Sequence, residues 1–180
     1  MILARRCSFI LLLALVAWMP LAHGAEATAP AAGTAAPDFT LTSNEGNPTS
    51  LKNFQGQWVV LYFYPKDFTS GCTLQAKNFQ KDLAKYEKAN AAVVGVSVDS
   101  AKSHKDFCAK EGLSFKLLSD PDAKVSTQYG SVMEYNGTKL SARNTFLINP
   151  SGQIAKVFLG VKPAGHSEEV LSALAQLQSQ

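Results

Sequence analysis

The sequence has 180 residues, of which 46% are hydrophobic and 17% charged, enough apolar side chains for the core of about one domain. This composition excludes a disordered chain or a collagen-like fibre, and three cysteines are too few for a small disulfide-held domain. The formal charge is +3 and no basic run alternates with aromatic residues, so nothing indicates a nucleic-acid partner.

Residues 1–24 have the three parts of a secretory signal peptide. Arg5 and Arg6 give a positive start, residues 9–21 are apolar and uncharged, and small residues precede a cleavage site at Ala25. A retained membrane anchor is the alternative, but the apolar run is shorter than the roughly 20 residues that span a bilayer. The arginine pair fits twin-arginine export poorly. We therefore expect a protein exported to the periplasm, with no membrane segment after signal cleavage.

Cleavage would also simplify the charge and the cysteine content. Without Arg5 and Arg6, 15 basic and 14 acidic residues remain, which leaves a net charge of +1. Cys7 would leave with the signal, so the mature chain would carry two cysteines in an oxidising compartment. Residues 25–36 are small and almost uncharged and suggest a flexible lead-in, so we expect one domain over 37–180.

The domain alternates between predicted strands and helices. An apolar run at 58–64 predicts a strand buried on both faces, and a second such strand is predicted at 92–98. Between them, at 70–89, apolar residues recur at steps of three and four, which predicts an amphipathic helix of about five turns.

The second half of the chain predicts shorter elements. A hairpin turn at Asn136-Gly137 is expected to join a weak strand to a strand at 144–148. The other expected elements are a helix at 101–111, a brief strand at 117–118, a short helix at 122–129, a strand at 154–159 and a last helix at 167–177. This order predicts an α/β domain, a central sheet with helices on both faces.

Cys72 lies where a loop meets the first turn of the helix predicted over 70–89. Unpaired N–H groups and the positive end of the helix dipole favour a thiolate there, which is the reactive form of cysteine. Thr69 lies three residues earlier and has a hydroxyl that could donate to an attacked oxygen. Position alone leaves a core cysteine equally open. No CxxC redox pair is present in the sequence.

The segment around Cys72 resembles a known family. Pro65-x-x-x-Thr69-x-x-Cys72 resembles the active-site pattern of the peroxiredoxins, and residues 63–76 resemble the bacterioferritin comigratory protein or peroxiredoxin Q subfamily. The resemblance covers roughly residues 36–178. Further matches are Pro-Asp-Phe at 37–39, Leu-Leu-Ser-Asp at 117–120 and the strand Arg-Asn-Thr-Phe-Leu-Ile at 143–148.

This resemblance implies a thioredoxin-like fold and the reduction of hydrogen peroxide and organic hydroperoxides, with no metal, haem or flavin. Cys72 matches the peroxidatic cysteine, and Thr69 matches the threonine that hydrogen-bonds the peroxide. Pro65 matches the proline that shields the sulfur from water. Arg143 matches the arginine that keeps the sulfur ionised and polarises the peroxide, which agrees with the need for donors where the leaving oxygen gains charge.

The resolving cysteine departs from the commonest pattern of the subfamily. Many members have it five residues after the first cysteine, where this chain has Lys77. Cys108 matches the position that other members use, so the resemblance implies a disulfide between Cys72 and Cys108 in one chain. A thioredoxin-like dithiol reductant would reset the pair, and the resemblance favours a monomer. A one-cysteine mechanism with an unreactive Cys108 stays open.

Four more residues have simple interpretations. Lys66 and Asp67 match the subfamily and are interpreted as loop scaffold. His104 lies four residues before Cys108 on one helix face and could lower the pKa of that thiol, although an exposed helix histidine is the simpler interpretation. His166, before the last helix, is expected at the surface.

Two other functions compete with a peroxidase. A general thiol–disulfide oxidoreductase could use the same fold, but the missing CxxC argues against it. A non-catalytic binding module is the other candidate, and the intact Thr69, Cys72 and Arg143 argue against that function.

Overall fold

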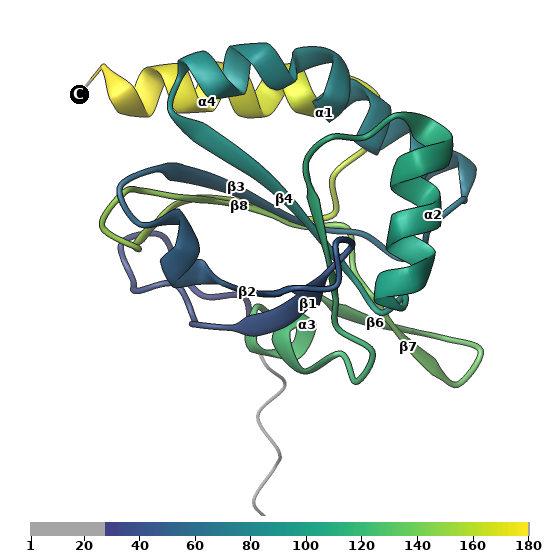
Figure 1. Ribbon diagram of the computed structural model, residues 1–180. Coiled ribbons are helices and arrows are strands. Elements are labelled where there is room, and N and C mark those ends of the chain that lie inside the picture. Colours follow the sequence, from purple (N-terminus) through teal and green to yellow (C-terminus); the bar gives the residue numbers. More distant parts are fainter. Residues whose placement is uncertain (1–27, 180) are drawn as a thin grey trace, which may run out of the picture.

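The computed structural model describes residues 28–179, so the predicted signal peptide and its cleavage site lie outside the described residues. A seven-stranded mixed sheet forms its centre, in the order β2-β1-β5-β4-β3-β8-β9 (Figure 1). The central strands β3, β4 and β5 are parallel, whereas β8 is antiparallel to β3. The strands are β1 (Thr40–Ser43), β2 (Pro48–Ser50), β3 (Trp58–Phe63), β4 (Ala91–Ser97), β5 (Lys116–Ser119), β8 (Thr145–Ile148) and β9 (Ile154–Phe158).

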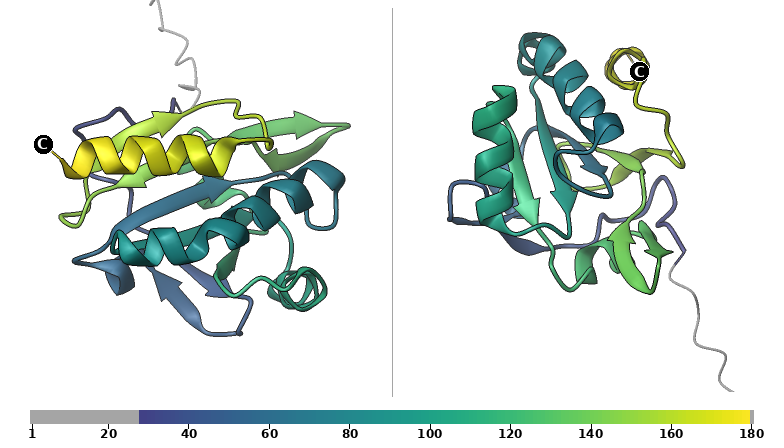
Figure 2. Two further views of the ribbon diagram at one scale, coloured as in Figure 1. Left: turned by 90° about the horizontal axis from the view of Figure 1, so that it is seen from above. Right: turned by 90° about the vertical axis from the view of Figure 1, so that its right-hand side faces the viewer.

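Helices cover both faces of this sheet, which confirms the predicted α/β class. Three lie side by side on one face, with α1 between α2 and α4 (Figure 2). A short α3 and the 3-10 helix η1 pack on the other face. No helix within residues 28–179 is long and apolar enough to cross a membrane. The helices are η1 (Leu51–Phe54), α1 (Ser70–Lys88), α2 (Ala101–Glu111), α3 (Lys124–Gln128) and α4 (His166–Gln178).

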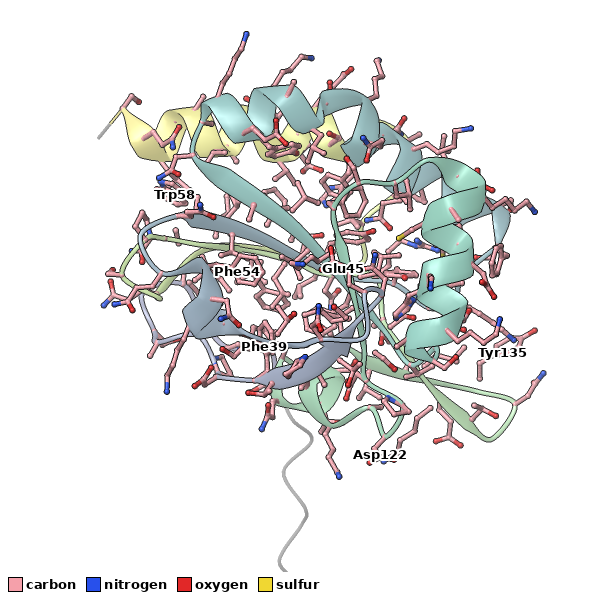
Figure 3. The ribbon with its side chains drawn as sticks, in the orientation of Figure 1. Phe39, Glu45, Phe54, Trp58, Asp122 and Tyr135 are labelled. Atoms are coloured by element: carbon pink, nitrogen blue, oxygen red, sulfur yellow. The ribbon has the colours of Figure 1, made fainter. Side chains whose placement is uncertain are left out.

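Strand β3 explains why its sequence is continuously apolar. Successive side chains of a strand point to opposite faces, and each face of this sheet carries its own core. Tyr62 belongs to the core under α1, α2 and α4, whereas Leu61 and Phe63 belong to the core on the other face. Figure 3 shows Phe39 and Phe54 on this second side. Both faces are therefore apolar along β3.

The hairpin turn is present, but it connects different strands from those expected. Asn136 and Gly137 both have positive φ, and they join β6 (Val132–Tyr135) to β7 (Thr138–Ser141) in a separate two-stranded sheet. A two-residue turn pairs the residues that flank it, here Tyr135 with Thr138, so the strand at 144–148 cannot be its partner. Tyr135 is exposed on this projecting hairpin (Figure 3).

The chain before β1 is attached to the far edge of the sheet. Gly33 N donates to the carbonyl of Ile154 at 2.7 Å, and Ala36 N donates to that of Gly152 at 2.9 Å. Residues 33–36 of the predicted lead-in therefore lie along the start of β9.

Gly95 allows β4 to pack closely against its neighbours. A Cβ atom at this position would lie 2.6 Å from Leu117 Cδ2 and 2.7 Å from Tyr62 Cζ. We expect Gly95→Ala to lower the free energy of unfolding by about 1–3 kcal/mol, because overpacking forces neighbouring side chains to move. Urea unfolding measures this change. Gly46→Asn is the control, since open space surrounds Gly46 and asparagine tolerates positive φ. Equal unfolding free energies for Gly95→Ala and wild type would contradict this packing.

Candidate active site

Cys72 lies in the first turn of α1, as the sequence predicted. The helix begins at Ser70 after the extended residue Thr69, and its first backbone bond runs from Thr73 N to Thr69 O at 2.9 Å. The N–H groups that precede this bond have no partner within the helix, so the sulfur lies near the positive end of the helix dipole. Cys72 is a free thiol with only 1% of its surface exposed.

Arg143 contacts the sulfur directly. Its Nη2 donates to Cys72 Sγ at 3.4 Å, and its Nη1 donates to Gln75 Oε1 at 2.8 Å. Because a guanidinium stays charged at any working pH, this contact places a lasting positive charge beside the sulfur. The structure therefore brings together two predicted residues that lie 71 positions apart.

The segment between β7 and β8 holds Arg143 in place. The Arg143 carbonyl accepts from Val161 N at 2.9 Å. The next side chain, Asn144, donates to Ser131 Oγ at 3.0 Å and accepts from Gly160 N at 2.9 Å. These bonds fix the backbone on both sides of the arginine, so its guanidinium is positioned before any substrate arrives.

Space for the guanidinium comes from Gly71. A Cβ atom at Gly71 would lie 3.3 Å from Arg143 Nη2, closer than most real contacts. A side chain at position 71 would therefore push the guanidinium by a few tenths of an ångström.

Gln75 is a site residue that the sequence reasoning missed. It is buried on α1, one turn after Cys72, and its side-chain oxygen accepts from Arg143. The sequence feature that could have indicated this role is the position of Gln75, a polar residue next to Ala76 on the buried face of an amphipathic helix. Such a residue needs a partner, because an unpaired polar group in a core is costly.

Thr69 and Pro65 lie in the loop before Cys72, but neither is hydrogen-bonded to the sulfur. Thr69 is exposed, and its Oγ1 donates to the carbonyl of Lys66 at 3.0 Å. Pro65 follows the end of β3 and is half-buried. Of the three residues that the sequence assigned around Cys72, only Arg143 is bonded to Sγ in this state.

Cys108 lies on α2 and is a second free thiol, with 7% of its surface exposed. It belongs to the same core as Cys72. Burial raises the pKa of Cys108 to about 11, and the negative charges of Asp67 and Glu45 add to this effect. At neutral pH Cys108 is therefore a protonated thiol and a poor nucleophile.

His104 is not the exposed histidine that the sequence suggested. It is fully buried, and its Nδ1 lies 2.9 Å from Asp67 Oδ2. Asp67 also accepts hydrogen bonds of 2.7 Å from Tyr64 Oη and from Ser103 Oγ, and its backbone N–H donates to Asp99 at 2.9 Å. Asp67 is thus the centre of a buried polar network.

The charge state of Asp67 follows from these bonds. Burial acts to raise the pKa of Asp67. The hydrogen bond and the charge of His104 act in the other direction, together with hydrogen bonds from Ser103 and Tyr64, and bring this pKa below its usual value. Asp67 is therefore a carboxylate. The sequence could not reveal this network, because the end of β3 and the start of α2 meet only through the parallel pairing of β3 with β4.

His166 is also buried, which corrects the expectation of a surface position. Its Nε2 lies 2.9 Å from Thr145 Oγ1, and its Nδ1 lies 3.1 Å from Glu169 Oε2. His166 is the first residue of α4 and lies on the face of the helix that is turned to the core. Its ring therefore packs on Phe79 and Phe158. Burial lowers the pKa of His166, against the opposing effect of Glu169.

Phe68 ties the loop before Cys72 to α2. Its φ is +62°, a strained conformation for an aromatic residue. Its ring packs edge-on against Phe107 with 5.1 Å between centroids, and Lys110 Nζ lies 5.5 Å from the centre of the ring. Together with Asp67 and His104, this contact links the loop of one cysteine to the helix of the other.

Comparisons with known proteins agree with these features. The model of the AhpC/TSA family matches residues 32–157. Peroxiredoxin Bcp of Xanthomonas campestris is 43% identical over 141 residues, which is 76% of this chain and 88% of that protein. The chloroplastic peroxiredoxin Q of Sedum lineare is 43% identical over 147 residues, covering 81% of this chain and 78% of the relative.

Solved structures show the same fold. The bacterioferritin comigratory protein of Xanthomonas campestris, described with a trapped intermediate and ligand in relation to its alkyl peroxide reduction, superposes with a TM-score of 0.74 at 40% identity. The match covers 81% of this chain and 98% of that one. The predicted thioredoxin-like fold is therefore confirmed.

Proposed function

Because the chain belongs to the AhpC/TSA family, in its peroxiredoxin Bcp and peroxiredoxin Q branch, we propose a cycle in which Cys72 attacks the hydroperoxide and Cys108 resolves the product. The protein is a thiol-dependent peroxidase. The observation that carries the assignment of Cys72 is its 3.4 Å contact with Arg143 Nη2.

In the first step the Cys72 thiolate attacks one peroxide oxygen. The S–O bond forms while the O–O bond breaks, which oxidises the sulfur to a sulfenic acid and reduces the peroxide. The other oxygen leaves as hydroxide or alkoxide and takes up a proton. Arg143 is placed to stabilise the thiolate and then the negative charge that develops on the leaving oxygen.

In the second step the Cys108 sulfur attacks the Cys72 sulfenic sulfur. The S–S bond forms, the S–O bond breaks, and the oxygen leaves as water with the thiol proton. Disulfide formation needs the two Cα atoms at about 4.4–6.8 Å, and the cysteines lie buried on different helices. We expect local opening of α1 at its first turn, or of α2 near Cys108, to precede this step.

The partners and location follow from the same proposal. Organic hydroperoxides join hydrogen peroxide as substrates, which the alkyl peroxide reduction named for the Xanthomonas relative supports. A thioredoxin-like dithiol protein would reduce the disulfide. The signal-like sequence at 1–24 supports export to the periplasm, where the protein would act as a monomer.

Replacement of Cys108 tests the resolving step. We expect Cys108→Ser to complete the first oxidation and then to stop at the sulfenic acid, or to proceed to sulfinic acid with excess peroxide. Turnover with a dithiol protein should fall sharply, because no disulfide is available for exchange. Mass spectrometry of the non-reduced protein should show wild type losing two hydrogens and yielding a cross-linked Cys72–Cys108 peptide pair.

Oxidised wild type without this cross-link would make Cys108 a structural residue. The protein would then be a one-cysteine peroxidase or would resolve through a second subunit. An intermolecular link would appear as a covalent dimer on a non-reducing gel, which separates these two outcomes.

A further inference from the structure

We propose that His104 accepts the proton of Cys108 in the resolving step and that Asp67 holds its imidazole in the tautomer that can do so. This inference rests on the proposed function, since it assumes that Cys108 attacks the oxidised Cys72. The proposal gives a role in the reaction to the buried pair Asp67 and His104, which takes no part in the first oxidation.

The resolving step needs a base close to Cys108. With a pKa of about 11, only about one Cys108 in 10⁴ is ionised at neutral pH. The thiolate is the nucleophile in thiol–disulfide chemistry, so an unassisted Cys108 would react slowly. A neighbouring group that takes the proton as the sulfur attacks removes this limit.

Asp67 determines which nitrogen of His104 carries the hydrogen. As a carboxylate, Asp67 can only accept hydrogen bonds, and its Oδ2 lies 2.9 Å from Nδ1. Nδ1 therefore carries the hydrogen, and in the neutral ring Nε2 keeps its lone pair. A carboxylate on one nitrogen also stabilises the imidazolium that forms when the other nitrogen takes up a proton.

The free nitrogen of His104 is buried and has no partner among the described residues. The contrast with His166 is informative, because both nitrogens of that buried histidine are engaged. A histidine kept only for structure would gain from pairing Nε2, since an unpaired buried polar group is costly. The unpaired Nε2 can therefore bind a partner that arrives during the reaction.

Cys108 is the group best placed to become that partner. It lies one helical turn after His104 on the same face of α2, and both residues are buried. Side chains on a helix lean toward its N-terminus, which directs Cys108 toward the turn that carries His104. The local opening at α2 that we expect to precede disulfide formation would let the sulfur reach Nε2.

The other groups around His104 do not compete for this role. Tyr64, directly after β3, has its hydroxyl 3.3 Å from Nδ1, and burial raises its pKa, so it stays neutral. Asp99, in the loop before α2, accepts a hydrogen bond from the Asp67 backbone N–H. Neither Tyr64 nor Asp99 is hydrogen-bonded to Nε2, so Nε2 stays open to Cys108.

The proposed step balances in atoms and electrons. The Cys108 S–H proton moves to Nε2 as the sulfur bonds to the Cys72 sulfur and the sulfenic S–O bond breaks. The departing hydroxide then takes the proton from the imidazolium and leaves as water. His104 ends neutral, and no further oxidant or reductant is needed.

The test compares disulfide formation in wild type and in His104→Asn. The asparagine amide can still donate to Asp67, so it preserves the link between the loop and α2, but it cannot act as a base. One equivalent of hydrogen peroxide starts the reaction, acid quenches it at intervals, and mass spectrometry measures the sulfenic acid and the disulfide separately. We expect disulfide formation at neutral pH to be slower by about 10²–10⁴ in His104→Asn.

The pH profile separates a base from a purely structural residue. In His104→Asn the rate of disulfide formation should rise about tenfold per pH unit toward the Cys108 pKa of about 11, where it approaches wild type. In wild type the rate should depend less steeply on pH, because His104 takes the proton as the sulfur attacks. A structural defect would instead lower the rate by one factor at every pH.

His166→Asn is the matched control. It makes the same exchange at a buried histidine on α4, and α1 separates α4 from α2 (Figure 2). Its disulfide should form at the wild-type rate.

Each outcome has a definite meaning. Disulfide formation in His104→Asn at the wild-type rate and with the wild-type pH profile would overturn the inference. Wild type that consumes peroxide without forming the disulfide would instead refute the proposed function of Cys108. If His104→Asn does not fold, Asp67→Asn replaces it. Its amide can donate to Nδ1 and move the ring hydrogen to Nε2, so the same loss is expected, and a wild-type rate would overturn the assignment.

Discussion

Replacing Cys72 by serine is expected to abolish peroxide turnover. A serine hydroxyl is not ionised near neutral pH, and it cannot accept the transferred oxygen as sulfur does. The substitution changes one atom in a buried side chain, so the fold should survive. Arg143 and Gln75 would remain in place, with only the nucleophile removed.

The measurement follows peroxide remaining with time in wild type, Cys72→Ser and Cys108→Ser. Cys108→Ser should still consume one equivalent, whereas Cys72→Ser should consume none although it retains the Cys108 thiol. That thiol is protonated at neutral pH because of its raised pKa, so it should not substitute for Cys72. Consumption of peroxide by Cys72→Ser at the wild-type rate would refute the assignment of the nucleophile.

The main helices and strands could be predicted because each shows a pattern of apolar residues within its own segment of the sequence. Helix α1 was predicted at 70–89 and ends at Lys88, since its apolar residues follow one helical face for five turns. Strands β3 and β4 are apolar on both faces because each is a central strand. The short strands β1 and β2 have no such pattern. They pair with each other, and only β1 joins the sheet through β5, which is distant in sequence.

The candidate site was predictable only in part, and for a similar reason. Cys72 and Arg143 were found through a motif, but the partners Gln75 and Asp67 act through contacts that no local pattern reveals. One signal at His104 was overlooked. His104, Phe107 and Cys108 have the spacing of a buried helical stripe, while Lys105 and Asp106 between them are exposed.

The loop before Cys72 contacts α2, the helix that carries Cys108. Asp67 and Phe68 hold this loop against α2 through His104 and Phe107. Movement of Phe68 away from α2 would break its contact with Phe107 and release the strain of its positive φ, while Asp67 could keep its bond to His104. In this arrangement Arg143 contacts the Cys72 sulfur, whereas we expect the resolving step to loosen the contact between Phe68 and Phe107. Replacement of Arg143 is therefore a test of the first step.

Arg143→Ala is expected to slow the reaction of Cys72 with hydrogen peroxide by about 10²–10³, the usual cost of removing a preorganised donor. Loss of the guanidinium removes the donor at 3.4 Å from Sγ, so a smaller fraction of Cys72 should be thiolate at neutral pH. It also leaves the buried Gln75 oxygen without its partner, so some loss of stability should accompany the loss of rate.

Single-turnover kinetics and the ultraviolet absorbance of the thiolate measure the two effects of Arg143→Ala separately. Arg143→Lys is the informative companion, because an ammonium keeps the charge but lacks the planar fork that bonds Sγ and Gln75 together. We expect it to restore much of the thiolate but only part of the rate, since the leaving oxygen also needs an oriented donor. Equal rates and equal thiolate absorbance in wild type and Arg143→Ala would show that the contact with Cys72 has no part in the chemistry. A lower rate with unchanged absorbance would assign Arg143 to the leaving oxygen alone.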